Sequence, residues 1–317
     1  MLRSLVGSEM CIRDRYFNIQ TKKYEALPGS ESFFILDSYR DQSPVLKNSE
    51  CCVHDIGDGV LCLEFTSKSN SIGEGIGKGL NEIIQLAEDG NWKGLVIGNN
   101  AKQFSVGANL MNIGMLAMQK QFDVLERFVD DFQSINMRIR TSKIPVVVAT
   151  QGYVFGGGCE IAMHCDAGIY AAESYIGLPE VGVGLLPAGG GVKELALRAS
   201  NKFFEGDVKI PTLLNHFKTI ATATISTSAC EAYNLGFLEE GRDHVCCNVQ
   251  RNIGEAKKKV LQMSFNYVPP SVRNDIEVLG RTGLSVLYSA INEFHLGGYM
   301  SDYDVVIARQ IASIITG

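Results

Sequence analysis

The stretch Pro145-Val-Val-Val-Ala-Thr-Gln-Gly-Tyr-Val-Phe-Gly-Gly-Gly-Cys-Glu160 decides how this chain folds. It opens on a buried strand at residues 145–149, passes three consecutive glycines in the turn 155–160, and enters a helix at residues 159–163. A triple glycine is by itself typical of a tight strand-to-helix turn. The functional interpretation is that missing side chains expose backbone N–H groups, and that the dipole of the following helix points at any oxygen approaching the turn. Both interpretations remain open on this stretch alone.

Outward from this turn, strands and helices alternate along the chain. Short apolar runs predict strands at residues 60–65, 94–98 and 167–171, and a helix at residues 80–88. A longer helix is predicted from apolar residues that recur at three- and four-residue steps on one face, namely Phe122, Leu125, Phe128, Phe132, Ile135 and Ile139. This alternation indicates an α/β fold built from units with right-handed crossovers.

A second glycine-bearing turn, Phe104-Ser-Val-Gly-Ala-Asn109, follows the strand at residues 94–98. One N–H from this turn and one from the triple-glycine turn would together form an oxyanion hole. A third glycine-rich segment, Leu186-Pro-Ala-Gly-Gly-Gly191, lies downstream of Gly177-Leu-Pro-Glu180. The predicted site therefore collects three segments whose backbone is exposed.

Two carboxylates adjoin these segments. Glu160 falls in the first turn of the helix after the glycines, where a simple charge–dipole role is the alternative. Glu180 follows Pro179, where a solvated loop position is the alternative. Two carboxylates converging beside an oxyanion hole can act as acid and base on a polarised thioester.

At this point the residues resemble a known family. The pattern K-x-F-x-x-G-A-N at residues 102–109, the run Gly156-Gly-Gly-Cys-Glu160 and the pair Pro179-Glu180 are similar to the crotonase (enoyl-CoA hydratase/isomerase) superfamily. The resemblance covers about residues 51–262 and is dense over residues 94–191. It implies an α/β fold, a crotonase-type spiral of ββα units with a helical C-terminal region.

The same resemblance implies roles for individual residues. The oxyanion-hole N–H groups carry over to Ala108 and Gly157, and the two glutamates of the hydratase branch to Glu160 and Glu180. The expected substrate-binding residues are Phe104, Gly107, Gly156, Met111 and Ala188. Two departures from the family pattern stand out, Asn109 in place of a common Asp and Ala188 in place of a common Gly. For Phe104, Met111, Met115 and Met118, an acyl pocket and the hydrophobic core are equally open.

The implied activity is hydration of trans-2-enoyl-CoA to 3-hydroxyacyl-CoA in fatty-acid β-oxidation. In that reaction Glu160 would deprotonate water and Glu180 would deliver a proton, with no metal and no bound cofactor, because CoA arrives as part of the substrate. Two alternatives remain. One is an enoyl-CoA isomerase that uses a single glutamate, and the other is a non-catalytic acyl-CoA-binding fragment of a larger fused enzyme.

Composition excludes several other classes of protein. With 29 Lys+Arg against 35 Asp+Glu the net charge is −6 and there is no basic tract, which argues against nucleic acid as a partner. No apolar run approaches the roughly 18 residues of a membrane helix. The nine cysteines contain no CxxC spacing, which indicates reduced thiols in a cytoplasmic protein.

One segment imitates a nucleotide-binding loop. Gly73-Glu-Gly-Ile-Gly-Lys-Gly79 lacks the G-x-G-x-x-G spacing, because position 78 is Lys. We therefore expect this segment to be a permissive loop before the helix at residues 80–88, and no nicotinamide site.

The domain interpretation has four parts. Residues 1–15 are expected to be a non-native leader, 16–50 a connector or remnant of an upstream dehydrogenase domain, 51–263 the crotonase-like domain, and 264–317 a helical region that is truncated. The flanks resemble the C-terminal part of fused 3-hydroxyacyl-CoA dehydrogenase/enoyl-CoA hydratase proteins. NAD would then bind only to the upstream domain, and that domain or another copy of this chain would be the protein partner.

Overall fold

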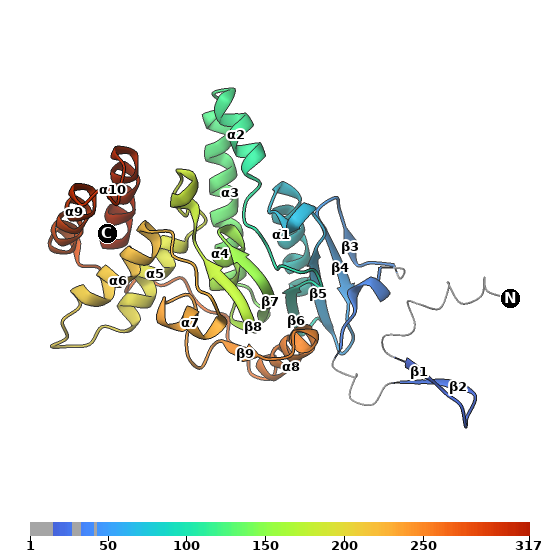
Figure 1. The fold of residues 1–317 in the computed structure, drawn as a ribbon. Coiled ribbons are helices and arrows are strands. Elements are labelled where there is room, and N and C mark those ends of the chain that lie inside the picture. Colours follow the sequence, from blue (N-terminus) through green and yellow to red (C-terminus); the bar gives the residue numbers. More distant parts are fainter. Residues whose placement is uncertain (1–14, 27–32, 41–42) are drawn as a thin grey trace.

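The computed structural model describes residues 15–26, 33–40 and 43–317, and its centre is one seven-stranded sheet (Figure 1). The strand order follows the chain from β3 to β9, with β3–β4–β5 antiparallel and β5 to β9 parallel. The strands are β3 (Leu46–Lys47), β4 (Cys51–Asp55), β5 (Val60–Phe65), β6 (Gly94–Gly98), β7 (Val146–Phe155), β8 (Ala167–Gly177) and β9 (His244–Cys246). The predicted α/β class is confirmed.

Strands β7 and β8 run further than the apolar pattern predicted, and this extension builds the site. The predicted strands ended at residues 149 and 171, whereas β7 reaches Phe155 and β8 reaches Gly177. A register shift between Thr150 and Gly152 separates the two halves of the pairing. Phe155 then pairs with Gly177, so the triple-glycine turn and the segment leading to Glu180 leave the sheet side by side.

The glycine-rich segment at residues 73–79, which imitates a nucleotide-binding loop, is helical from Glu74, so the prediction of a permissive loop there was wrong. Helix α1 (Glu74–Asp89) begins six residues before the predicted start. A Cβ on Gly77 would lie 2.7 Å from Ile135, and one on Gly79 would lie 2.3 Å from the Cys51 sulfur. These glycines let the helix pack closely against its neighbours, and the Glu50 carboxylate accepts the Ile76 N–H at the helix start.

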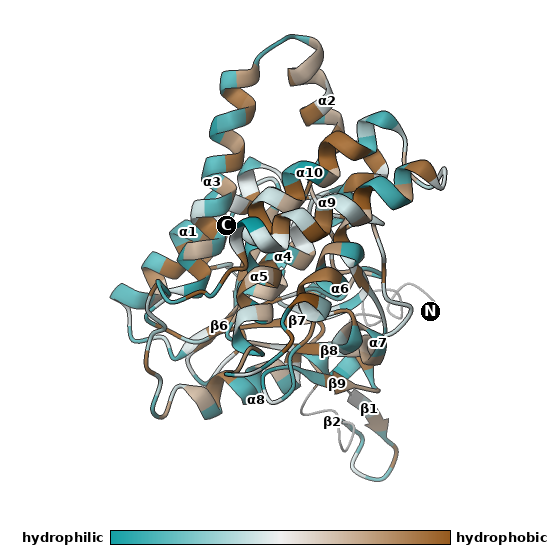
Figure 2. Ribbon diagram, turned by 90° about the vertical axis from the view of Figure 1, so that its left-hand side faces the viewer, coloured by the Kyte–Doolittle hydropathy of each residue, from teal (hydrophilic) through white to brown (hydrophobic). Residues whose placement is uncertain are grey.

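Helices α2 (Leu110–Met118) and α3 (Phe122–Arg140) form a projecting pair. Figures 1 and 2 show α2 and the start of α3 standing clear of the sheet. All nine residues of α2 are described and none of them is buried, and the α3 side chains buried in the body are Ile135, Asn136 and Ile139. The apolar face predicted for this helix is therefore only half covered, since Phe122 at its start is 60% exposed.

The remaining helices lie around the sheet and towards the C-terminus. They are α4 (Gly157–His164), α5 (Gly191–Asn201), α6 (Ile210–Ala221), α7 (Ala229–Asn234), α8 (Asn252–Met263), α9 (Gly280–Leu296) and α10 (Asp302–Thr316). The prediction of helix from residue 264 was wrong for its first part, because residues 267–279 have no regular structure and include Pro269-Pro270, which lack N–H donors. Helix α10 packs against α5, α6 and α9.

The N-terminal region contributes little to the sheet. Strands β1 (Arg15–Asn18) and β2 (Lys23–Ala26) form a separate antiparallel pair, and residues 1–14, interpreted above as a leader, lie outside the described residues. Leu46–Lys47 already pairs with β4, so the sheet begins slightly before the predicted residue 51. Within the described ranges, no helix combines the length and the apolar character needed to cross a membrane.

Candidate active site

Two backbone N–H groups meet where β7 ends. The bridge between Ile72 and Ala108 uses the Gly107 carbonyl and the Asn109 N–H, which leaves the Ala108 N–H without an acceptor among the described residues. Gly157 is the first residue of α4, so its N–H has no acceptor within the helix. A Cβ on Gly107, whose φ is +88°, would lie 3.4 Å from the Gly157 nitrogen, so the two turns touch. The predicted pair of donors is therefore brought together.

The Glu160 carboxylate is buried at the N-terminus of a second helix. Its Oε1 accepts the Gly191 N–H at 2.8 Å, and Gly191 is the first residue of α5. Burial raises the pKa of Glu160 to about 7, while the N–H groups of Gly189, Gly190 and Gly191 and the nearby Lys193 oppose that rise. These N–H donors stabilise the carboxylate form of Glu160, which is buried away from water.

The loop that holds Glu160 is itself held by α3. The side chains of Gln133 and Asn136 donate to the carbonyls of Ala188 and Gly189, each at 2.7 Å. A Cβ on Gly189 would lie 2.4 Å from the Glu160 Oε2, so that position admits no side chain without displacing the carboxylate. Carbonyls facing α3 and N–H groups facing Glu160 give the loop its orientation.

Glu180 lies against Gly156 of the triple-glycine turn. It begins the short helix η4 (Glu180–Val183), and its Oε1 would lie 3.0 Å from a Cβ on Gly156, whose φ is +52°. Its Oε2 is buried with no hydrogen-bond partner among the described residues. Burial first, and then the charge of Glu160, raise the pKa of Glu180 to about 8.

Two carboxyls with these surroundings titrate as a pair. Glu160 has backbone donors that favour its charged form, whereas the bare Glu180 oxygen favours the protonated form. Environments that push two carboxyl pKa values apart are suited to a base and an acid acting on one substrate. The free N–H groups of Ala108 and Gly157 add a place for a developing oxyanion.

The other predicted substrate-binding residues divide into two groups. Gly107, Gly156 and Ala188 lie in the loops that form the site. Phe104 does not, because its ring is completely buried 5.4 Å from that of Phe65, so the core alternative holds for this residue. Met111 lies one turn beyond the oxyanion turn on α2 and is 75% exposed.

Several residues that shape the site were not singled out from the sequence. Gln133 and Asn136 lie on the predicted long helix but outside its apolar face, and Phe132 was predicted only as part of that face. The apolar pattern indicates packing and does not indicate hydrogen bonding to a loop 53 to 55 residues away. Their signal was weak, since an amide on a helix is ordinarily a surface residue. A hollow of about 960 Å³ between residues 33–37, the loop 99–103 and the strand residues Tyr153 and Tyr175 contains none of the site residues.

Cys159 is a buried thiol beside the site. Burial raises its pKa well above the usual range, and the charge of Glu180 adds to the effect. A thiol that does not ionise is a poor nucleophile, which agrees with the packing interpretation of this residue.

Comparisons with known proteins find one family model and many relatives. Residues 55–205 match the family model described as enoyl-CoA hydratase/isomerase. A probable 3-hydroxyacyl-CoA dehydrogenase of Bacillus subtilis is 36% identical over 93% of this chain and 37% of its own length. A mitochondrial enoyl-CoA hydratase of Pongo abelii is 31% identical over 43% of this chain and 46% of its own length. The chain therefore spans less than half the length of these two curated relatives.

Solved structures share the fold. An enoyl-CoA hydratase/isomerase from Mycobacterium paratuberculosis superposes with a TM-score of 0.56 at 24% identity, covering 85% of this chain and 98% of that one. An enoyl-CoA hydratase from Polaromonas has a TM-score of 0.56 at 16% identity, covering 83% of this chain and 89% of that one. The expected crotonase-type fold is confirmed.

Proposed function

We propose that this chain hydrates trans-2-enoyl-CoA thioesters to 3-hydroxyacyl-CoA, because residues 55–205 match the family model described as enoyl-CoA hydratase/isomerase. The observation that carries the proposal is the pair of carboxyls: Glu160 is buried and accepts a backbone N–H, and Glu180 has a buried oxygen with no hydrogen-bond partner among the described residues. A hydration needs a base for water and an acid for the carbon that becomes a carbanion, and the pair supplies both.

In the proposed reaction the thioester oxygen accepts hydrogen bonds from the N–H groups of Ala108 and Gly157. This contact withdraws electrons from the double bond and stabilises the enolate that forms when water adds. Glu160, in its anionic form, takes a proton from the water that attacks C3. Glu180, in its protonated form, gives a proton to C2, so one water is added across the double bond and no redox partner is consumed. CoA enters with the substrate, and no bound cofactor takes part.

The relatives also support a place beside a dehydrogenase. The Bacillus relative that matches most of this chain is named a probable 3-hydroxyacyl-CoA dehydrogenase, and another relative is named a fatty acid oxidation complex subunit alpha. We therefore include in the proposal that the product is handed to an NAD-dependent dehydrogenase domain or partner in cytoplasmic fatty-acid oxidation. In that arrangement NAD belongs to the dehydrogenase and not to the described residues.

The test follows the loss of enoyl absorbance with crotonyl-CoA and longer trans-2-enoyl-CoA esters. Glu160→Gln and Glu180→Gln keep the side-chain shape, and each is expected to lower kcat by about 10²–10⁴-fold with a small change in KM. The double variant should lose less than the product of the two single losses, because the residues act as a unit. Glu173→Gln, an exposed glutamate on β8, is the matched control and should leave kcat unchanged.

Two other results would replace the proposal. Conversion of cis-3-enoyl-CoA to a 2-enoyl product that is not hydrated would make the protein an isomerase. Binding of CoA esters by calorimetry with no turnover on any chain length would make it a non-catalytic acyl-CoA-binding protein.

A further inference from the structure

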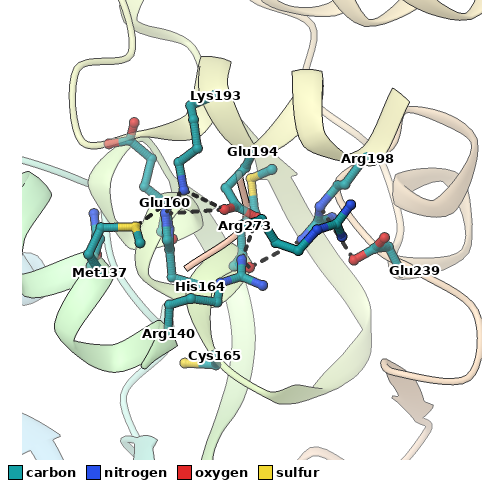
Figure 3. A network of polar contacts seen from close by, with 12 residues as sticks. Met137, Arg140, Glu160, His164, Cys165, Lys193, Glu194, Arg198, Glu239 and Arg273 are labelled. Carbon is teal, nitrogen blue, oxygen red and sulfur yellow. Dashed lines mark hydrogen bonds and ion pairs between the residues drawn. The ribbon is translucent and has the colours of Figure 1, made fainter. Parts of the chain in front are cut away.

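A cluster of charged side chains lies beside Glu160 (Figure 3). It joins α3, α4 and α5 through Arg140, His164, Lys193 and Glu194. The Glu194 side chain is 1% exposed and the His164 side chain 1%, so the cluster is part of the interior. No member of this cluster belongs to the sequence motifs, and none takes part in the proposed reaction.

His164 has one defined tautomer in this cluster. Its Nδ1 lies 2.6 Å from the backbone oxygen of Glu160, which only a ring N–H can satisfy, so Nδ1 carries the proton. Burial lowers the pKa of His164 to about 3, so the ring is neutral and Nε2 is an acceptor. Lys193 Nζ donates to that nitrogen at 3.0 Å. The ring therefore connects the backbone of Glu160 to the ammonium of Lys193.

Lys193 uses its full donor capacity here. Besides His164, its Nζ donates to Glu194 Oε1 at 2.6 Å and to the Met137 sulfur at 3.6 Å. These three acceptors come from α4, α5 and α3. Lys193 lies in the first turn of α5. The helix dipole disfavours a cation at that position, so the lysine is placed there against the usual charge preference.

The glycine loop that cradles Glu160 rests on the same ring. A Cβ on Gly190, whose φ is +114°, would lie 3.1 Å from His164 Cε1, so only a glycine fits between the ring and the loop. Arg140 donates to Glu194 and to the Met163 carbonyl, which ties the last turn of α4 to α5. The start of α5 is thus fixed to α4 on one side and to α3 on the other.

We propose that Lys193 is a positioning residue of the site, which holds the N-terminus of α5 against α4 through His164 and Glu194 and whose ammonium keeps Glu160 in its carboxylate form. This inference rests on the proposed function for its consequence, since an anionic Glu160 is what the hydration step needs. The geometry behind it is independent of any substrate. Lys193 acts on Glu160 through the helix start and through its field, and it touches no reacting atom.

Among the charged and titratable groups around Glu160, the cations Lys193 and Arg140 share the single carboxylate of Glu194, which leaves a net positive charge beside Glu160. From η4 comes Glu180, which is protonated when Glu160 is charged. From α4 comes His164, which is neutral, and Cys159, whose thiol does not ionise. From α5 come Glu194 and Lys193, and Arg140 of α3 pairs with Glu194. The Lys193 charge is among the groups that lower the pKa of Glu160.

The experiment compares Lys193→Met, Lys193→Gln and Lys193→Arg with the parent in the pH dependence of kcat/KM for crotonyl-CoA. Loss of the ammonium in the first two variants should move the acid limb upward by about one pH unit, with KM nearly unchanged. That shift is about a tenfold loss of kcat/KM below the limb. Lys193→Arg should restore the parent profile. Lys202→Met is the matched control at the exposed far end of α5 and should leave the profile unchanged.

A titration without substrate separates this inference from the proposed function. Carbon-13 NMR of glutamate-labelled protein, with the Glu160 signal assigned by its loss in Glu160→Gln, should show the same upward shift in Lys193→Met. If the parent turns over no enoyl-CoA, the proposed function fails and this titration alone decides the inference. An unshifted Glu160 titration in a folded Lys193→Met protein would overturn it. Lys193→Gln, which keeps a donor for His164, decides the question if the methionine variant does not fold.

Discussion

Gly189→Ala is expected to damage the candidate site with a single methyl group. A Cβ at this position would lie 2.3 Å from Phe132 Cε1 and 2.4 Å from Glu160 Oε2, distances that real Cβ atoms do not show. The backbone of Gly189 is not in the left-handed region, so alanine brings no conformational strain and the effect is steric. Either the Phe132 ring or the Glu160 carboxylate has to move.

The structure sets the size of the effect. Adding a methyl to a filled interior typically costs about 1–3 kcal/mol of stability. A displacement of about 1 Å in a reacting group can lower a rate by about 100-fold, so we expect kcat to fall about 10- to 100-fold while KM changes little. Chemical denaturation measures the first quantity and the loss of enoyl absorbance the second. Gly114→Ala, on α2 with no atom within 4 Å, is the control and should stabilise by about 0.5–1 kcal/mol.

A second substitution separates the two contacts. Phe132→Leu in the Gly189→Ala background removes the clash with the ring and leaves the contact with Glu160. We expect it to recover stability but not kcat. A Gly189→Ala enzyme with kcat within about twofold of the parent would refute the reasoning, because Glu160 would then not lie against this loop during turnover.

Two further predictions concern pH and the support of α4. Because the pKa values of Glu160 and Glu180 are raised, the folded protein holds protons that the unfolded chain has released. The free energy of unfolding should therefore fall as pH rises from about 4.5 through about 8. In Glu180→Gln this fall should be less steep. A pH-independent difference between the two unfolding curves would contradict this. Arg242→Met should lower the free energy of unfolding by about 3–5 kcal/mol in denaturant, because Arg242 donates to three carbonyls at the end of α4 and pairs with the buried Asp243. The control Arg127→Met, at an exposed position on α3, should change that free energy by less than about 0.5 kcal/mol.

Local pattern was enough to predict the class of fold and where the site's backbone is exposed. Apolar runs identified strands β5 and β6, because strands that are buried on both faces are mostly apolar. Glycines at positions 107 and 156 marked turns because their positive φ values exclude most side chains. These signals are carried by a few neighbouring residues, so a single sequence contains them.

The pattern was insufficient where distant segments decide the outcome. The glycines of α1 were misinterpreted as a loop because what determines them is the lack of space against Ile135 and Cys51. Phe104 was open between pocket and core until its neighbour Phe65 was known. In each case the same residue type is compatible with either structure, and packing selects one.

The sequence by itself determined which residue types the candidate site contains: two glutamates and three glycine-rich segments, two of which are turns that follow strands. Only the tertiary structure decided how the glutamates differ. Glu160 meets the start of α5, 31 residues away, and Glu180 faces a glycine with an oxygen left bare. Desolvation and hydrogen bonding set a carboxyl's pKa, and both depend on what the fold brings within a few ångströms, which the order of residues along the chain does not state.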